Sequence, residues 1–520
     1  MGDQDEHRQR GGSPTAAFYS GRGVLVTGAS GLMGKVLVEK LLWAVPDVGN
    51  VFMLMRPKRG KTPAERLAAI QDLPVFERVR RDCPQQLAKM RMVAGDVGLE
   101  NLGIQQKDLE QLKSEVSVVF HCAATLKLEG SLKDALHFNT RGTQRALQLA
   151  RELPRLKVFV HTSTAFCHCD EDVLQERAYP PPMSPENMMN CGDLVDEASL
   201  EIVAQQILAP HPNTYTYSKR LAEDLVARSH AELPVCIVRP SIVCPAWEEP
   251  VPGWVDNLNG PVGVMAAAGK GVIRSMYCCG EFNAEVIPLD FAVNATLVAA
   301  CRVATGPRED AVPVFNLTSG KWRTATWSAV LDEGRRAGYE YPFEMILWYP
   351  DGNIRSSRRS HDVHAFFQHR LPAYFIDFMM ILFRQPRFMV RIYKRIALGL
   401  ELLQFFTTRQ WKFDNDRFMA LWDSMPPGDR RLFNFDIQEP KMSEYIDRCI
   451  LGARQYCLKE DPATIPRQRR LLKVYYIADR LVVLLFYGLL LWLVSRLFVG
   501  DSTAASPSRL LANEAFAARS

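Results

Sequence analysis

The sequence predicts an α/β fold with a doubly wound parallel sheet, a mostly helical C-terminal domain and a C-terminal membrane helix. Three observations support this prediction. Short apolar runs alternate with helical patterns in the first half of the chain. A glycine-rich turn joins the first apolar run to the next helix. Near the C-terminus, a long apolar run carries no charge. Alternation of strands and helices is typical of parallel sheets covered by helices.

Six short apolar runs are expected to form the strands of the sheet. Helical patterns separate them, notably over residues 32–44 and 132–153. The runs are apolar throughout rather than alternating, as expected for strands that are buried on both faces. The expected strands are residues 24–26, 51–55, 92–96, 116–120, 158–160 and 235–238.

The changes of composition along the chain predict its division into segments. A looser stretch, 170–212, is rich in Pro, Met and Glu, and such insertions often shape a substrate site. From about residue 360 the pattern becomes helical. The predicted segments are a flexible tail (1–19), an α/β domain (20–355), a helical domain (356–457), a basic linker (458–473), a membrane segment (474–498) and a tail (499–520).

Composition excludes several classes of protein. The net charge is only +5 over 520 residues, and no basic-aromatic pattern suggests a nucleic-acid-binding module. The 12 cysteines are scattered, which favours reduced thiols over a disulfide framework. Cys167-His168-Cys169 lacks a second ligand pair at zinc-site spacing, so no metal site is expected.

The apolar run near the C-terminus is expected to enter a membrane. Residues 481–495 carry no charge, and extension to 474–498 reaches the roughly 20 residues that a span needs. The alternatives are a buried core helix or a hairpin that only dips into the bilayer. Basic residues before the run predict a single pass with the large N-terminal part in the cytosol. The C-terminus lacks SKL-type and KDEL-type signals, and we favour the endoplasmic reticulum over the peroxisome.

The turn after the first strand suggests a nucleotide site. Gly28, Gly31 and Gly34 are spaced as GxxGxxG, which lets the backbone approach a pyrophosphate at a helix N-terminus. The alternative is a tight strand-helix turn without a ligand. The remaining residues of this loop that we assign to cofactor binding are Thr27, Ser30, Leu32 and Met33.

The ends of the next strands indicate which nucleotide is bound. The second strand ends in Arg56 and offers no carboxylate for a ribose 2′-hydroxyl, so a 2′-phosphate and NADPH are favoured over NAD. Lys58 and Arg59 follow Arg56 and also suit a 2′-phosphate. The alternative for these two residues is that they are solvated loop charges. Asp96, with Val97, is expected to contact adenine, and Ala123 lets the backbone pass close to the cofactor.

The stretch 213-NTYTYSKRLAED-224 suggests the chemistry. Tyr215 precedes Lys219 by four residues, so both lie on one helix face, whereas Tyr217 faces away. The ammonium can lower the phenol pKa and bind the nicotinamide ribose, and the phenol can protonate a carbonyl oxygen as hydride arrives. Thr164, or alternatively Ser163, ends the fifth strand and would polarise the same carbonyl.

These motifs together resemble the fatty acyl-CoA reductases, which are extended short-chain dehydrogenase/reductases with a Rossmann-type sheet and a male-sterility-type C-terminal domain. The insect and animal enzymes are the most similar. The resemblance covers roughly residues 20–475. The blocks that carry it include TGASGLMGK, VFHCAATLKLEG, VFVHTSTAF, NTYTYSKRLAE, PGWVDNLNGPVGVMAAAGKGVIRSMY and FFTTRQWKFDND.

The resemblance implies NADPH-dependent reduction of a long-chain acyl-CoA, through an aldehyde, to a primary fatty alcohol. It implies contact with a lipid membrane and leaves an oligomer open. The helical domain is expected to supply the acyl tunnel, and the alternative is that its aromatic-rich helices are plain core. Ser30, Leu32, Met33 and Phe166 depart from the usual family residues. The alternatives are a related reductase of another carbonyl, such as a sterol dehydrogenase, and a non-catalytic NADPH-binding scaffold.

Overall fold

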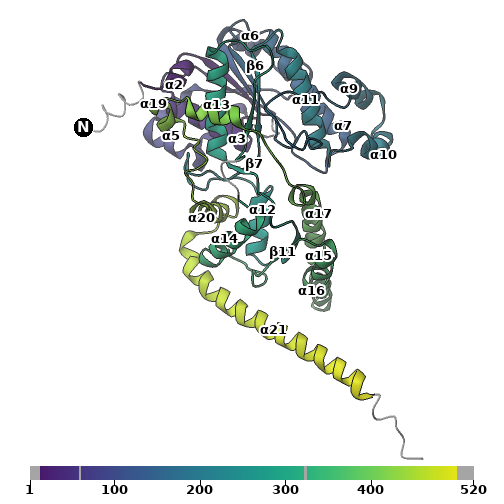
Figure 1. Ribbon diagram of the computed structural model, residues 1–520. Coiled ribbons are helices and arrows are strands. Elements are labelled where there is room, and N and C mark those ends of the chain that lie inside the picture. The colour runs from purple at the N-terminus through teal and green to yellow at the C-terminus, as the bar shows by residue number, and fades with distance from the viewer. Residues whose placement is uncertain (1–11, 58–59, 321–324, 501–520) are drawn as a thin grey trace, which may run out of the picture.

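The computed structural model describes residues 12–57, 60–320 and 325–500 (Figure 1). Its centre is a seven-stranded sheet in the order β10-β6-β5-β4-β1-β2-β3, and all neighbouring strands are parallel. The doubly wound fold is therefore confirmed. The strands are β1 (Gly23–Thr27), β2 (Val51–Met55), β3 (Met90–Ala94), β4 (Val116–His121), β5 (Val158–Thr162), β6 (Val235–Pro240) and β10 (Val314–Leu317).

Helices cover both faces of this sheet. Val24 and Val26 of β1 pack into one hydrophobic cluster with α3 and α13, whereas Leu25 packs into another with α6, α8 and α11. Burial on both faces explains why the strands are apolar at every position. The helices of this layer are α3 (Leu32–Ala44), α4 (Pro63–Gln71), α5 (Glu77–Asp82), α6 (Gln106–Glu115), α7 (Leu132–Ala135), α8 (Arg141–Arg151), α11 (Thr214–Ser229) and α13 (Leu289–Thr305).

The predicted N-terminal tail is wrong in its last residues. Pro14–Tyr19 form helix α2, in which Tyr19 is fully buried and its hydroxyl donates to the Leu297 carbonyl at 2.7 Å. The Thr15 hydroxyl donates to Asp429 at 2.6 Å. Partners this distant in sequence cannot be recognised from a polar N-terminal composition. Residues 1–11 lie outside the described part of the chain.

A smaller unit follows the sheet and lies below it in Figure 1. Two parallel two-stranded ribbons, β7–β9 and β8–β11, accompany α12 and α14 there. The insertion over 170–212 forms two further helices beside α7 and α11. The elements are β7 (Ile242–Cys244), β8 (Ser275–Tyr277), β9 (Val286–Pro288), β11 (Asn353–Arg355), α9 (Pro185–Leu194), α10 (Glu197–Leu208), α12 (Pro261–Gly269) and α14 (Trp327–Glu340).

The helices after residue 356 divide into two groups. α18 packs on α13 and β10, and its Phe418 joins the same core cluster as β1. α20 packs on α14. By contrast, α15 to α17 project away from the sheet (Figure 1). The helices are α15 (Arg358–Ala365), α16 (Leu371–Leu382), α17 (Met389–Thr407), α18 (Asp416–Asp423), α19 (Pro427–Leu432) and α20 (Met442–Gly452).

The last described element is the long helix α21 (Ile465–Gly500), which includes residues 465–473 of the expected basic linker. Residues Pro462–Arg496 are a candidate membrane span by length and composition. Asp479 is buried near the start of the apolar part of α21. Its carboxylate accepts hydrogen bonds from Trp348 Nε1 at 2.6 Å and from Arg274 at 3.2 Å, which anchor the helix to the rest of the protein. Beyond this anchor, large apolar residues such as Leu485 are exposed. The alternative of a buried core helix therefore does not hold for that part of α21.

Candidate active site

The glycine turn lies between β1 and α3, at the point where the strand order reverses. Gly28 has φ +71°, and a Cβ there would lie 2.7 Å from the Ala123 nitrogen. A Cβ on Gly34 would overlap the Gly28 carbonyl. Gly31 caps α3 without a side-chain hydrogen bond, so the N–H groups of the first turn are left for an anion. Gly28 and Gly34 therefore need glycine for the backbone itself, and Gly31 leaves the helix N-terminus open.

The other loop residues differ in accessibility. Ser30 is exposed, and Leu32 and Met33 are half-buried in the first turn of α3. Thr27 is buried, with its hydroxyl 2.8 Å from His121 Nδ1 and 3.3 Å from the Ala123 nitrogen. Burial lowers the pKa of His121 to about 3. Thr27 and His121 therefore form an internal polar contact that positions the turn.

The remaining cofactor candidates lie at the same carboxyl edge of the sheet. Arg56 is exposed directly after β2. Asp96 is half-buried after β3 and accepts a hydrogen bond from the Gly98 nitrogen at 2.9 Å, while Val97 is buried beside it. Ala123 follows β4 and is half-buried. Ligands of doubly wound sheets bind at this edge, near the switch point. Lys58 and Arg59 lie outside the described residues.

Helix α11 carries Tyr215 and Lys219. Asn213 caps the helix by accepting from the Thr216 nitrogen at 2.9 Å. Lys219 is 2% exposed, and its ammonium donates to the Thr162 carbonyl at the end of β5 at 2.6 Å. Burial lowers the pKa of Lys219 to about 8. The helix is thereby tied to the end of the strand that precedes Thr164.

Tyr215 and Thr164 are brought together as predicted. Burial raises the pKa of Tyr215, and a hydrogen bond with the Thr164 side chain partly offsets that rise. The Thr164 hydroxyl is thus one group that lowers this pKa, and the lowering expected from the Lys219 ammonium stays a prediction. Ser163 instead directs its hydroxyl to Cys167 Sγ at 3.7 Å. Of the two hydroxyl candidates, Thr164 is the one that bonds the phenol.

Tyr217 faces the opposite side of α11, as the sequence predicts. It is 1% exposed and packs in an apolar cluster with Leu132 and Leu221. Its ring lies 5.4 Å from that of His211, edge to face. The two tyrosines therefore have separate environments, although they are only two residues apart.

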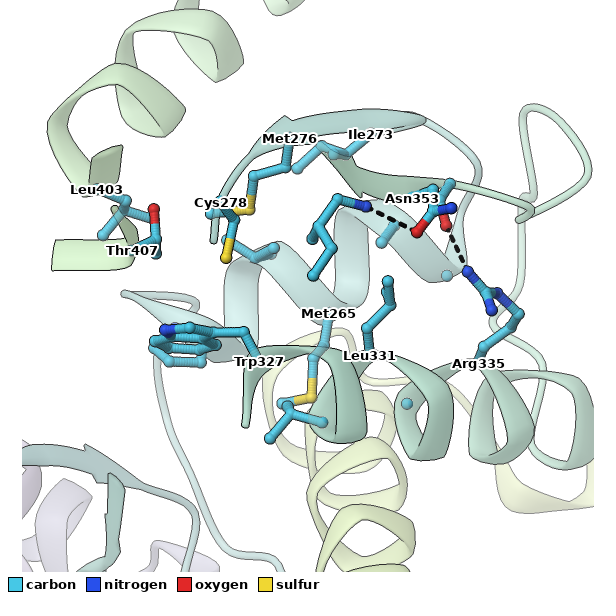
Figure 2. A pocket seen from close by; sticks show the side chains of 18 of the residues that line it. Met265, Ile273, Met276, Cys278, Trp327, Leu331, Arg335, Asn353, Leu403 and Thr407 are labelled. Atoms are coloured by element: carbon cyan, nitrogen blue, oxygen red, sulfur yellow. Dashed lines mark hydrogen bonds between the residues drawn. The ribbon is translucent and has the colours of Figure 1, made fainter. Parts of the chain in front are cut away.

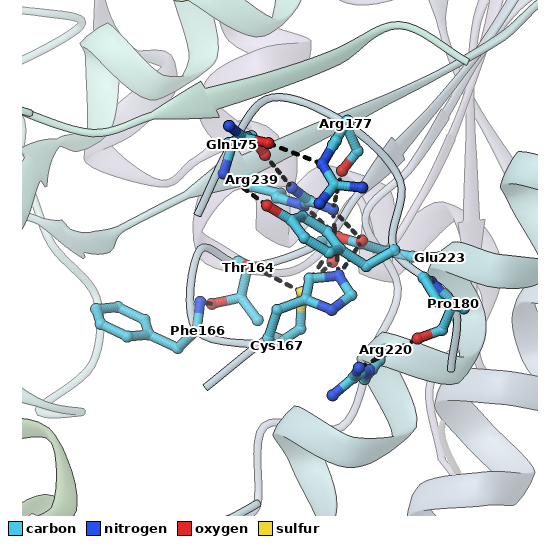
Figure 3. Close-up of polar contacts among 12 residues, drawn as sticks. Thr164, Phe166, Cys167, Gln175, Arg177, Pro180, Arg220, Glu223 and Arg239 are labelled. Atoms are coloured by element: carbon cyan, nitrogen blue, oxygen red, sulfur yellow. Dashed lines mark hydrogen bonds and ion pairs between the residues drawn. The ribbon is translucent and has the colours of Figure 1, made fainter. Parts of the chain in front are cut away.

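A buried polar cluster supports the loop after Thr164 (Figure 3). Arg239, from β6, donates to Glu223 of α11 at 2.8 Å, and His168 Nε2 lies 2.8 Å from the same carboxylate. Cys167 donates to Glu223 at 3.2 Å. Burial would raise the pKa of Glu223, but Arg239 and His168 hold it well below its usual range. Sequence reasoning missed this cluster because its members come from three separate segments.

This cluster includes three groups that could ligate a metal ion. One donor atom each from Cys167, His168 and Glu223 lie within 4.8 Å of one another. The Arg239 guanidinium, however, bonds the Glu223 carboxylate and lies 3.2 Å from His168 Nε2. A permanent cation among the donors opposes a second one, and the donors already have partners. The arrangement is therefore that of a structural ion pair.

An apolar pocket of about 260 Å³ lies in the smaller unit that contains α12 and α14 (Figure 2). Phe166, two residues after Thr164, lines it together with Ile242. Most of its wall comes from α12, β8, α14 and β11, and α17 adds only Leu403, Phe406 and Thr407. The predicted helical domain thus contributes only these three residues to the pocket, and the acyl tunnel expected there stays a prediction. Most of the pocket residues are spread over 260–354, where no local sequence period marks them.

The family models agree with this architecture. A model described as male sterility protein, of the NAD-binding type, matches residues 26–296. A second, the Sterile model of male sterility proteins, matches residues 368–460. The first match covers the sheet, α11 and the catalytic candidates, and it supports a nicotinamide cofactor.

Solved structures share the fold at low sequence identity. A reductase domain of a nonribosomal peptide synthetase from Mycobacterium tuberculosis superposes with a TM-score of 0.55 at 19% identity, covering 84% of this chain and 96% of that one. The terminal R domain from the myxalamid pathway gives 0.53 at 17% identity, covering 85% and 93%.

Relatives match over nearly the whole chain. Fatty acyl-CoA reductase 2 of Bos taurus is 36% identical over 92% of this chain and 94% of its own length. Fatty acyl-CoA reductase wat of Drosophila melanogaster is 34% identical over 92% of each chain. The chain belongs to the fatty acyl-CoA reductase family of oxidoreductases.

Proposed function

We propose that the protein reduces a long-chain fatty acyl-CoA to a primary fatty alcohol, with NADPH as the reductant and an aldehyde as the intermediate. The observation that carries this proposal is the apolar pocket that includes Phe166, two residues from Thr164. A buried alkyl chain gains about 0.8 kcal/mol per CH₂ in such a pocket. Hydrocarbon binding is thereby adjacent to the Thr164–Tyr215 pair. The names of the relatives support the acyl-CoA substrate.

The carboxyl edge of the sheet fits NADPH. The backbone around Gly28, Gly31 and Gly34 would hold the pyrophosphate, and Arg56 would pair with the 2′-phosphate. Asp96 would accept from adenine. Lys219 would bond the nicotinamide ribose with the donors that Thr162 leaves free. The bound cofactor supplies the hydride.

The hydroxyls of Thr164 and Tyr215 would together hold one carbonyl oxygen of the substrate. In the first half-reaction they would stabilise the oxyanion while CoA leaves as a thiolate. In the second, Tyr215 would give its proton to the alkoxide formed from the aldehyde. The overall balance is one thioester, two NADPH and two protons to one primary alcohol, one CoA thiol and two NADP⁺.

A stoichiometric assay tests the proposal. Detergent-solubilised protein is incubated with palmitoyl-CoA and NADPH, NADPH consumed is counted per free CoA, and the lipid product is identified by gas chromatography. Two NADPH per CoA with hexadecanol is the expected result. One NADPH per CoA with accumulating aldehyde would restrict the protein to the first half-reaction. Bound NADPH without turnover on any acyl-CoA would reject the proposal in favour of another substrate or a scaffold.

A further inference from the structure

The helices α15 to α17 expose an unusually large apolar surface. Arg358–Leu382 form one long helix, made of α15, Phe366–Arg370 and α16, and α17 returns antiparallel to it. We call this unit the α15–α17 hairpin. Within residues 358–400 only Ala365, Ala373 and Met389 are buried hydrophobics. The exposed ones are Val363, Phe366, Phe367, Leu371, Tyr374, Phe375, Phe378, Ile381, Leu382, Phe383, Phe388, Ile392 and Leu398.

These residues form a stripe rather than a scatter. Val363, Phe367, Leu371, Tyr374 and Phe378 follow one another at intervals of three or four residues, which places them on one helix face. Several of the rings are more than half exposed, including Phe375 and Phe378 at 61% each. Soluble monomers rarely leave a continuous apolar face of this kind in water, so the face is expected to have a partner.

The position of the hairpin identifies the partner. The Phe367 ring lies 6.4 Å from the ring of Phe486, which belongs to the uncharged part of α21. Phe486 lies beyond the buried Asp479, in the part of α21 whose large apolar residues are exposed. The apolar face of the hairpin is therefore continuous with the candidate membrane span. Figure 1 shows the hairpin and α21 projecting from the same side of the molecule.

The charges of the hairpin fit a lipid surface. Residues 358–407 contain eight Arg or Lys and three Asp or Glu. Arg384, Arg387 and Arg391 are exposed around the turn between α16 and α17. Apolar faces bordered by Arg and Lys are typical of helices that lie in the interface of an anionic bilayer. Two copies of this face would bring like charges together, which disfavours a homodimer.

We propose that the α15–α17 hairpin inserts its apolar face into the same bilayer as α21, as a second membrane-embedded element. The hairpin is also joined to the pocket wall. His369 Nε2 accepts hydrogen bonds from the backbone nitrogens of Arg274 and Ser275, at 2.8 and 3.2 Å. Ser275 begins β8, whose Met276 lines the apolar pocket. Insertion of the hairpin thus places the pocket against the membrane surface.

Photo-crosslinking of the full chain in anionic phospholipid vesicles tests this proposal. A benzophenone amino acid is introduced singly at Phe375 or Phe378, and at Leu485 of α21 as the membrane reference. Ile202 of α10 is the matched control, because it is an apolar residue that is 81% exposed on the distant α9–α10 side of the molecule. The vesicles carry radiolabelled phosphatidylcholine and phosphatidylserine.

We expect labelled lipid adducts at positions 375, 378 and 485 and none at 202. Adducts at 485 alone would overturn the proposal, because they would show that α21 enters the bilayer without the hairpin. Adducts between two protein chains at 375 and 378, in place of lipid, would also overturn it and would identify the face as a protein interface. Each variant is accepted only if its circular dichroism spectrum matches that of the parent.

Discussion

Tyr215 and Tyr217 lie two residues apart on α11, and their surroundings separate their roles. Tyr215 bonds the Thr164 side chain, whereas Tyr217 packs among apolar residues. Tyr215→Phe is expected to lower kcat by about 10²- to 10⁴-fold through loss of the proton donor. Tyr217→Phe is the matched control and is expected to keep kcat. Both are measured as hexadecanol formed from palmitoyl-CoA, and loss of activity in Tyr217→Phe alone would contradict our assignment of the donor.

Lys219 predicts a pH dependence. Burial lowers its pKa to about 8, so its ammonium loses a proton as the pH rises through 8. Since the charged form is the one that would bond the ribose, kcat/KM for acyl-CoA at subsaturating NADPH is expected to fall above pH 8. Lys219→Arg, whose guanidinium stays charged, is expected to lose this descending limb while keeping part of the activity. A parent profile that stays flat from pH 7 to 9 would argue against the role of Lys219.

Arg239 and Glu223 predict a large effect on stability. Both side chains are almost fully buried and bond each other, together with His168. Arg239→Met leaves the Glu223 carboxylate without its main partner, so the free energy of unfolding is expected to fall by about 3–5 kcal/mol. Arg151→Ala removes an exposed pair with Glu232 and is expected to change it very little. Urea unfolding measures the free energy of unfolding of both variants. An equal loss in both would show that the buried cluster stabilises the fold no more than the exposed ion pair does.

At the scale of elements, α14 predicts the chain-length preference. Gly334 and Gly338 lie one turn apart and line the apolar pocket, and a Cβ at either would meet no atom within 4 Å. Glycine inside a helix destabilises the helix by about 1 kcal/mol relative to alanine. We infer that the open space these two glycines leave in the pocket offsets this loss. Gly338→Leu should fill part of the 260 Å³ and shift the preferred acyl-CoA to shorter chains.

A competition assay with C12 to C18 acyl-CoAs measures this shift. Gly399→Leu is the matched control, because Gly399 lies inside α17 with no atom near its Cβ and does not line the pocket. It should leave the preference unchanged. An unaltered preference in Gly338→Leu, with a stable fold, would show that the acyl chain does not reach α14.

The elements also show where sequence patterns succeed. The boundaries of α3, Leu32–Ala44, agree with those predicted, and the glycine turn marks where the helix begins. β10 (Val314–Leu317) was not predicted, since a four-residue run gives little periodic signal. α2 was missed because its stability depends on partners near residues 297 and 429.

At the scale of the whole molecule, α21 and the basic residues before it predict a cytosolic catalytic part. In sealed microsomes, external protease is expected to digest an N-terminal epitope without detergent. NADPH-dependent activity should be measurable without permeabilisation for the same reason. Protection of the epitope until detergent is added would place the sheet on the lumenal side and reverse the proposed topology.

The sequence by itself determined the fold class, the glycine turn, the register of the Tyr215–Lys219 face and the apolar run of α21. These depend on local periodicity and on backbone geometry, which neighbouring residues specify. Tertiary structure alone decided which hydroxyl bonds Tyr215, how Glu223 meets Arg239 and which segments enclose the pocket. It also decided that the aromatic residues of α15–α17 face outward. Contacts between separate segments depend on how the helices pack around the sheet, and no local pattern records that packing.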